Sequence, residues 1–284
     1  MQIELSTSSD ADHRKAIVAP LAAYNQAQTG RDDPDLTLGI LLRDAEGRVE
    51  GGMWGEQYYD WFKLSFAFLP AHRRGARLGA RMLSTLEAAA VARGARGVWM
   101  NSFSFQAPGF YEKLGYHVIG RLEDRPPGHS DTFLAKTEGF AREGASLVVT
   151  EGVEEADRLA VRDPLVEYSN QFAGAPDWLG LDLLVRDDSG AIVGGLHGRT
   201  GRKWLFVDLL GLPDNLRHAG LGTQLMDRAE AEARARGCIG VWLDTFSFQA
   251  RPFYERRGFK VFAEIPDYPA GHSRYFLSKR LDAA

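Results

Sequence analysis

The sequence contains only one cysteine, Cys238, among 284 residues. A single thiol excludes an intrachain disulfide and any cysteine-rich metal site, and we expect it to be a buried thiol at the start of a strand. The sequence also lacks an apolar run of the ~20 residues that would span a bilayer. No basic region followed by an apolar run comes after Met1, so we expect no secretory signal and a cytoplasmic location.

A strong excess of charge of either sign is lacking too. The formal net charge is −4, and the sequence pI is about 6.0. Nucleic-acid-binding domains usually carry a basic stripe, so we expect no nucleic-acid partner and no membrane partner. No cluster with metal-ligand spacing is present, and no metal is expected. Apolar residues make up 44% and charged residues 25%, which is ordinary for a globular protein with a sizeable core.

An internal repeat with a constant offset of 143 residues dominates the sequence. Residues Ala92–Lys136 align with Ala235–Lys279 without a gap, and 24 of the 45 positions are identical. This period is too long for a solenoid, whose units run about 20 to 50 residues. We therefore predict two copies of one domain, residues 1–140 and 141–284. The polar, glycine-bearing segment Thr137–Ser146 reads as the linker between them.

Each copy shows the same order of predicted elements. A strand, a helical region and a β-hairpin come first, and a further strand leads into a glycine-bearing turn. An amphipathic helix, a strand, a short helix and two final strands follow. In the second copy, strands are predicted over residues 147–150, 181–186, 191–197, 205–212, 239–243, 260–265 and 274–278. This order predicts an α/β (α+β) fold, with a mixed, mostly antiparallel sheet flanked by helices in each copy.

Two segments of the second copy carry a family resemblance. Residues Arg217–Gly222 read RHAGLG and open a helix, where free backbone N–H groups suit a phosphate. This segment resembles the Arg/Gln-x-x-Gly-x-Gly/Ala acyl-CoA loop of the GNAT superfamily of N-acetyltransferases. Residues Phe253–Phe259 resemble the Phe-Tyr-Glu-Lys-x-Gly-Phe segment of that family. Both matches recur one offset earlier, in Arg74–Gly79 and Phe110–Tyr116, so the resemblance covers nearly the whole chain as two tandem GNAT-like domains.

The resemblance implies an enzyme that moves an acetyl group from acetyl-CoA to a primary amine by direct attack on the thioester. Tyr254 occupies the position of the family's general acid, and Asp208 lies near its acidic base. Strand residues Leu210, Gly211 and Leu212 would bind the pantetheine arm through their backbone. The residues expected to hold the pyrophosphate of coenzyme A are Arg217, His218, Ala219, Gly220, Leu221 and Gly222.

Each assignment has a simpler alternative. Tyr254 could be a core aromatic residue, and Asp208 could pair at a strand end while a water relay acts as the base. His272 lies in a Pro-x-Gly-His-Ser turn that recurs around His129, so it either contacts substrate or closes a loop. Gln249 is expected to hold the loop that precedes Tyr254.

The two copies differ at the positions that matter for this chemistry. Arg77 replaces the central loop glycine in the first copy, and Ser65 stands where the second copy has Asp208. Tyr111 is kept at the position of Tyr254. We therefore expect the second copy to be the catalyst and the first to be a degenerate partner that packs against it.

The acceptor is expected to be a small-molecule amine. Three alternatives stay open: a non-catalytic acyl-CoA-binding or sensing protein, a protein or peptide N-acetyltransferase, and a chain in which both copies acetylate. Two arrangements stay open: a homodimer, or a single chain whose two internal copies suffice as a pseudo-dimer.

Overall fold

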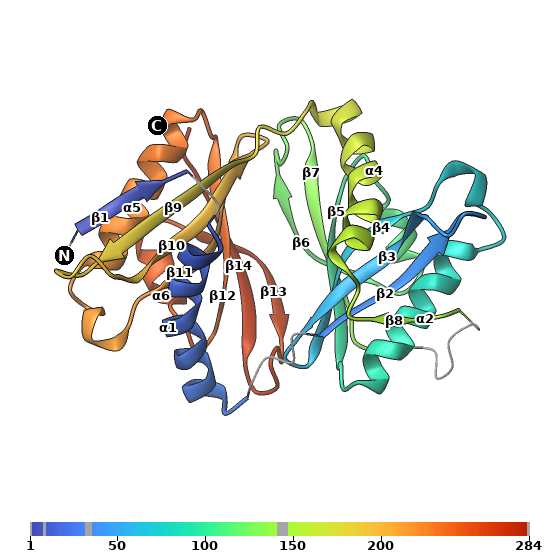
Figure 1. Ribbon diagram of the computed structural model, residues 1–284, viewed down its shortest axis with the longest axis horizontal. Helices are drawn as coiled ribbons and strands as arrows, with labels where there is room; N and C mark the ends of the chain where they lie inside the picture. Colours follow the sequence, from blue (N-terminus) through green and yellow to red (C-terminus); the bar gives the residue numbers. More distant parts are fainter. Residues whose placement is uncertain (1, 8–9, 32–35, 141–146, 283–284) are drawn as a thin grey trace.

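The computed structural model describes residues 2–7, 10–31, 36–140 and 147–282. These residues form one continuous 14-stranded sheet flanked by helices (Figure 1). The strand order is β1-β9-β10-β11-β12-β14-β13-β6-β7-β5-β4-β3-β2-β8, and most neighbours are antiparallel. The predicted class, a mixed and mostly antiparallel sheet flanked by helices, is confirmed.

The strands are β1 (Gln2–Ser6), β2 (Leu36–Arg43), β3 (Val49–Tyr58), β4 (Trp61–Phe68), β5 (Gly97–Phe103), β6 (His117–Glu123), β7 (Ser130–Lys136), β8 (Thr150–Glu151), β9 (Leu179–Arg186), β10 (Ile192–Gly201), β11 (Trp204–Gly211), β12 (Gly240–Phe246), β13 (Lys260–Pro266) and β14 (Ser273–Arg280). The α-helices are α1 (Ala11–Thr29), α2 (Leu78–Ala92), α3 (Pro108–Glu112), α4 (Glu155–Ala173), α5 (Leu221–Ala235) and α6 (Arg251–Arg256).

One predicted strand is wrong in extent. A strand is expected over residues 147–150, but β8 consists of Thr150–Glu151 alone. The reason is its place at the sheet edge, where it forms only two register pairs with β2. The predicted linker, Thr137–Ser146, lies outside the described residues over positions 141–146.

The first strand and helix of each copy pack on the sheet of the other copy. β1 pairs with β9, and α1 packs against β10 and β11, whereas β8 pairs with β2 and α4 packs against β3 and β4 (Figure 1). We call residues 36–140 and 147–173 the first half, and residues 2–7, 10–31 and 179–282 the second half. Each half therefore contains segments of both sequence copies, and the division at residues 140 and 141 describes the repeat rather than the spatial units.

The two halves meet through equivalent positions. Between β13 and β6, Ala263 is the register partner of Gly120, which lies one offset earlier in the sequence. Elsewhere, Trp61 Nε1 donates a hydrogen bond to the carbonyl of Asp267 at 3.1 Å. The matching residue Trp204 donates to the carbonyl of Asp124 at 2.8 Å. Such reciprocal contacts are those of a symmetric dimer interface, here formed within one chain.

Each half buries apolar residues on one face of the sheet beneath a long helix, which we call the helix face. On α5, buried positions recur with helical spacing at Leu225, Met226, Ala229 and Ala233. The opposite face, which we call the inner face, carries an aromatic cluster shared by both halves. That cluster includes Trp61, Trp99, Phe133, Trp204, Trp242 and Phe276.

Helix α1 lies very close to β11. A Cβ atom on Gly211 would lie 2.1 Å from the carbonyl oxygen of Ile17, so only glycine permits this approach. No helix within the described ranges has the length and apolarity to cross a bilayer.

Candidate active site

The parallel strands of the second half separate before they end. The last register pair of β11 and β12 is Val207 with Leu243, although β11 continues to Gly211 and β12 continues to Phe246. The strands therefore enclose a V-shaped gap, which we call the second opening. The helices that follow β11 and β12 along the chain, α5 and α6, both begin on this side of the sheet.

One edge of β11 has no strand partner along the second opening. The other edge pairs with β10, where Leu210 lies opposite Leu196. Backbone N–H and C=O groups on the open edge are available to an extended ligand, which can bind as an added strand does. Leu210 lies on this stretch and Leu212 follows it directly. Of the three positions predicted for the pantetheine arm, Leu210 and Gly211 thus lie on this strand and Leu212 lies just beyond its end.

A β-bulge places Asp208 at the mouth of the second opening. Leu209 pairs with His197 and Val207 pairs with Gly198, which leaves Asp208 as the extra residue of β11. Bulges re-aim side chains and are common next to active sites. Because Val207 packs in the core on the helix face, the half-buried side chain of Asp208 lies on the inner face.

A second carboxylate, Asp244, lies on β12 at the same level. Asp208 and Asp244 each follow directly after the last register pair of β11 and β12. The side chain of Asp244 forms a 2.7 Å ion pair with Arg274. Asp244 is absent from the residues predicted above. Its counterpart in the first copy is the neutral Asn101, so a comparison of charge between the copies is the signal that could have found it.

Tyr254 approaches the second opening from the other face of the sheet. It belongs to the core beneath α5 and is 7% exposed. Burial raises the pKa of Tyr254 far above its ordinary value of 10.0, and the negative charge of Asp244 raises it further. The phenol therefore stays protonated at neutral pH, as a general acid must. Tyr254 and Asp208 flank the opening from opposite faces.

The predicted phosphate-binding loop joins β11 to α5. Gly220 precedes the helix with a φ of 79°, a left-handed conformation that glycine adopts without strain. The side chain of Arg217 is engaged within the loop, since its Nε donates to the carbonyl of Leu212 at 3.0 Å and it pairs with Asp214 at 3.0 Å. The remaining predicted loop residues are the exposed His218, Ala219 and Gly220 and the half-buried Leu221 and Gly222.

The matching loop of the first half has a different backbone. Arg77 precedes α2 in the left-handed region, with a φ of 55°, which costs a non-glycine residue roughly 1 kcal/mol. Gly75 and Ala76 also have positive φ, at 107° and 44°. The N–H of Leu78 donates to the carbonyl of Gly75 at 3.0 Å. One amide at the helix start is therefore already used within the loop.

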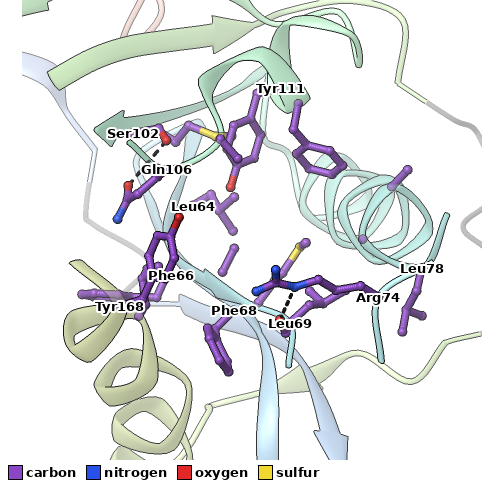
Figure 2. A pocket seen from close by; sticks show the side chains of 18 of the residues that line it. Leu64, Phe66, Phe68, Leu69, Arg74, Leu78, Ser102, Gln106, Tyr111 and Tyr168 are labelled. Carbon is purple, nitrogen blue, oxygen red and sulfur yellow. Dashed lines mark hydrogen bonds between the residues drawn. The ribbon is translucent and has the colours of Figure 1, made fainter. Parts of the chain in front are cut away.

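A cavity of about 540 Å³ occupies the matching opening of the first half, which we call the first opening (Figure 2). The hydroxyl of Tyr111 points into it, and Tyr168 of α4 forms part of its wall. Burial raises the pKa of Tyr111 to about 12. Arg74 is tied to the carbonyl of Leu69, as Arg217 is to its own loop. The copy expected to be degenerate thus keeps a cavity of ligand size.

Helix α1 packs over the second opening, although it belongs to the first sequence copy. Tyr24 Oη donates to the carbonyl of Phe248 at 2.7 Å, and Asn25 Oδ1 accepts from Gln249 Nε2 at 2.8 Å. The guanidinium of Arg217 lies 4.2 Å from the ring centroid of Tyr24. Helix α4 makes the matching contacts with the first half. The second opening is therefore built from both copies.

His272 lies in its predicted turn, with Nδ1 3.3 Å from Ser247 Oγ and its ring 4.9 Å from that of Phe248. His129 has the same surroundings in the first half, with Ser104 at 3.4 Å. These contacts describe a closed turn, and a substrate contact for His272 stays a prediction.

Neither a metal nor a reactive thiol is part of the site as described. Cys238 is buried, as expected, and burial raises its pKa to about 11. Within the described ranges, no group of three or more His, Cys, Asp or Glu side chains is arranged to hold a metal ion.

Comparison with known proteins gives matches along both copies. Residues 7–116 and 153–259 match the model of the acetyltransferase (GNAT) family. An acetyltransferase from Agrobacterium fabrum is 40% identical over 121 residues, which are 43% of this chain and 88% of that protein. A blasticidin-S acetyltransferase from Streptomyces morookaense is 47% identical over 95 residues, which are 33% of this chain and 70% of that protein. A solved structure of a candidate acetyltransferase from Agrobacterium tumefaciens has 37% identity and a TM-score of 0.46, and the match covers 48% of this chain and 99% of that one.

Proposed function

This chain belongs to the acetyltransferase (GNAT) family and is an N-acetyltransferase, and on that premise we propose that acetyl transfer takes place at the second opening. The donor in this proposal is acetyl-CoA. The acceptor is the primary amine of a small molecule. The two halves of one chain serve as the pseudo-dimer that the site requires. The proposed location is the cytoplasm.

The observation that carries this proposal is the placement of Tyr254 and Asp208 on opposite faces of the sheet at one gap between strands. A protonated phenol lies on the helix face, and a carboxylate lies on the inner face. An acyl transfer to an ammonium needs a proton acceptor on the side of the amine and a proton donor on the side of the leaving group. In the first half, Ser65 occupies the place of Asp208 and cannot accept a proton at neutral pH.

The residues around the second opening fit the donor. The start of α5 offers free N–H groups and the positive end of the helix dipole to the pyrophosphate, and Gly220 keeps side-chain atoms away from it. The open edge of β11 offers backbone groups to the pantetheine arm around Leu210, and Leu212 follows directly after the strand. Arg217 fixes the loop through Leu212 rather than reaching freely for the phosphate.

In the proposed reaction, Asp208 and Tyr254 each carry out one proton transfer. Acetyl-CoA, when bound, supplies a thioester whose carbonyl carbon is the electrophile. Asp208 accepts a proton from the acceptor ammonium, and the neutral nitrogen can then attack. As the C–N bond forms and the C–S bond breaks, Tyr254 donates its proton to the departing sulfur. The attacking nitrogen then loses its second proton, and this proton restores the Tyr254 phenol, so each turnover releases one net proton through Asp208. The products are the acetamide and the free thiol of coenzyme A.

A small-molecule acceptor is favoured by the relative that is 47% identical, a blasticidin-S acetyltransferase. A protein or peptide acceptor is the alternative. A thiol-release assay over blasticidin S, free amino acids, polyamines and peptides with free N-termini separates the two. Turnover confined to peptides would replace the small-molecule proposal, and acetyl-CoA binding without turnover on any amine would favour a sensor.

A second function is favoured by the cavity in the first half. It has the size of a ligand site, but Ser65 and Asn101 provide no carboxylate at its mouth. We propose that the first opening binds an acyl-CoA without transferring its acyl group. Calorimetric titration of the whole chain with acetyl-CoA should then show two binding sites, and one site would contradict this second function.

The exchange Asp208→Asn tests the catalytic assignment, with Ser65→Ala as its matched control at the other bulge. We expect kcat/KM of the Asp208 variant to fall by roughly 10²- to 10⁴-fold, the range for loss of a general base. Acetyl-CoA binding should be nearly unchanged, since the carboxylate lies on the inner face. Equal activity of both variants and the native chain would remove Asp208 from the mechanism.

A further inference from the structure

A row of polar side chains crosses the inner face of the second half and starts at the candidate base. His197 on β10 lies opposite the bulge that contains Asp208. The register partner of His197 on the other side is Asp182 on β9, whose next partner is Ser6 on β1. Side chains that are directly opposed across strands share a face and lie close together. The row therefore connects the mouth of the second opening with the edge of the sheet.

Two members of this row, His197 and Asp182, are in direct contact beneath α1. Nδ1 of His197 lies 2.6 Å from Oδ1 of Asp182. Nδ1 of His13 on α1 lies 3.4 Å from the other oxygen, Oδ2. The side chain of Asp182 is 1% exposed, whereas those of His197 and His13 are 11% and 16% exposed. A buried carboxylate thus lies between two mostly buried imidazoles.

The first half has no such row. One offset earlier, Gly39 stands in place of Asp182, and Trp54 stands in place of His197. Trp54 instead donates to the carbonyl of Arg158 on α4 at 3.3 Å. The fold therefore forms without the polar row, because an indole and a glycine fill the same positions. The row occurs only in the half whose bulge carries Asp208.

The short contact fixes which nitrogen of His197 can accept a proton. An ionised Asp182 accepts a hydrogen bond from Nδ1–H, so in the neutral imidazole Nε2 carries the lone pair. A proton taken up at Nε2 gives an imidazolium that still donates from Nδ1 to Asp182. A buried carboxylate that orients a histidine in this way keeps it in one tautomer.

We propose that His197, held by Asp182 and His13, is a positioning residue that receives the acceptor's proton from Asp208 and releases it to solvent. This inference rests on the proposed function of the second opening. In each turnover, Asp208 gains one proton from the ammonium and passes it through an intervening water to Nε2 of His197. Deprotonation of the imidazolium to solvent restores both groups, so no other co-reactant is needed.

Other charged groups belong to the same surroundings. They are Glu4 on β1, Arg186 on β9, Arg199 on β10, and Lys63, Asp244 and Arg274 around the mouth of the opening. Glu4 and Arg186 pair with each other at 2.6 Å, as Asp244 pairs with Arg274 at 2.7 Å. Two cations, Arg199 and Lys63, therefore also neighbour the row, whose own carboxylates are Asp182 and Asp208.

The first experiment needs no acceptor. NMR of the ¹⁵N-labelled imidazoles gives the tautomer of His197, assigned through His197→Gln, in the native chain and in Asp182→Ala. We expect the Nδ1–H tautomer in the native chain, where Asp182 accepts the hydrogen bond, and loss of this preference in Asp182→Ala, while His129 in its turn of the first half serves as the control. An Nε2–H tautomer of His197 in the native chain would overturn the proposal.

The second experiment measures acetyl transfer by thiol release with blasticidin S, or with whichever amine of the panel above is turned over. His197→Gln keeps a hydrogen-bond donor for Asp182 but cannot titrate. We expect the kcat/KM of this variant to fall about tenfold or more, and the acidic limb of its pH profile of kcat/KM to shift. Acetyl-CoA binding should be unchanged. His129→Gln, in the matching turn of the first half, is the control, and His13→Asn is a second variant that keeps His197 in place. A native pH profile in His197→Gln would contradict the relay. Inactivity of the native chain on every amine would instead contradict the proposed function, and the NMR result would then decide whether His197 is held as the relay requires.

Discussion

The guanidinium of Arg217 lies 4.2 Å from the ring centroid of Tyr24, which belongs to the other sequence copy. Arg217 also fixes the end of β11 through the carbonyl of Leu212. Helix α1 of the first copy therefore supports the predicted coenzyme A loop of the second copy. The exchange of the first strand and helix between the halves makes each opening a composite of both copies.

Replacement of the Tyr24 ring should weaken donor binding. Cation–π contacts contribute about 0.5 to 2 kcal/mol, so Tyr24→Ala should raise the KM for acetyl-CoA by roughly 3- to 10-fold as the loop loosens. Tyr24→Phe keeps the ring and removes only the bond to Phe248, so its KM should stay close to the native value. Native KM values for both variants would show that α1 does not support the loop.

An exchange of residues between the two loops tests the role of the central glycine. Gly220→Arg places a side chain at a φ of 79°, a conformation that disfavours non-glycine residues by roughly 1 kcal/mol. We expect a rise of about fivefold or more in the KM for acetyl-CoA, with kcat changed less. The matched exchange Arg77→Gly should leave acetyl transfer unaffected. If Arg77→Gly alone alters turnover, the catalytic opening has been assigned to the wrong half.

The pKa of Tyr111 gives a prediction for stability at alkaline pH. Burial raises this pKa from 10.0 to about 12, so the folded state disfavours the phenolate that the unfolded chain forms freely. The associated stabilisation is fully present below pH 10 and is lost as the pH rises from 10 toward 12. Between pH 9 and pH 11, the native chain should lose about 1 kcal/mol more unfolding free energy than Tyr111→Phe. Urea unfolding of both proteins at the two pH values measures this difference, and parallel losses would contradict it.

Much of the fold could be predicted from the sequence because its signals are local. The repeat, the order of strands and helices along each copy and the glycine-bearing loop all follow from short-range patterns. The structure has its elements in the same order along the chain. The docking of α1 is not a local property. Because the strands of the two halves have the same sequence pattern, the sequence alone does not tell which half Tyr24 and Ile17 pack against. Only the spatial packing, including the close approach of Ile17 to Gly211, reveals which half they complete.

The candidate site could be predicted only in part for a similar reason. Tyr254 and Asp208 lie in recognisable segments, so the motif locates them. Asp244 and His197 can be recognised as site residues only from the strand register. That register places His197 on β10 and Asp244 on β12, the two strands that neighbour the strand of Asp208. The cavity in the first half also depends on how far β4 and β5 separate after Lys63 and Trp99. No residue pattern in the loop reports that separation.

The central claim is that one of two equivalent tyrosines, Tyr254, donates the proton to the leaving thiol. Acetyl transfer by Tyr254→Phe and by Tyr111→Phe, measured side by side as kcat and as KM for acetyl-CoA, tests it most directly. We predict that Tyr254→Phe loses roughly 10²-fold or more in kcat, the range for a general acid, with little change in KM, while Tyr111→Phe keeps native kcat. Native turnover in Tyr254→Phe, or loss of turnover in Tyr111→Phe instead, would contradict the account.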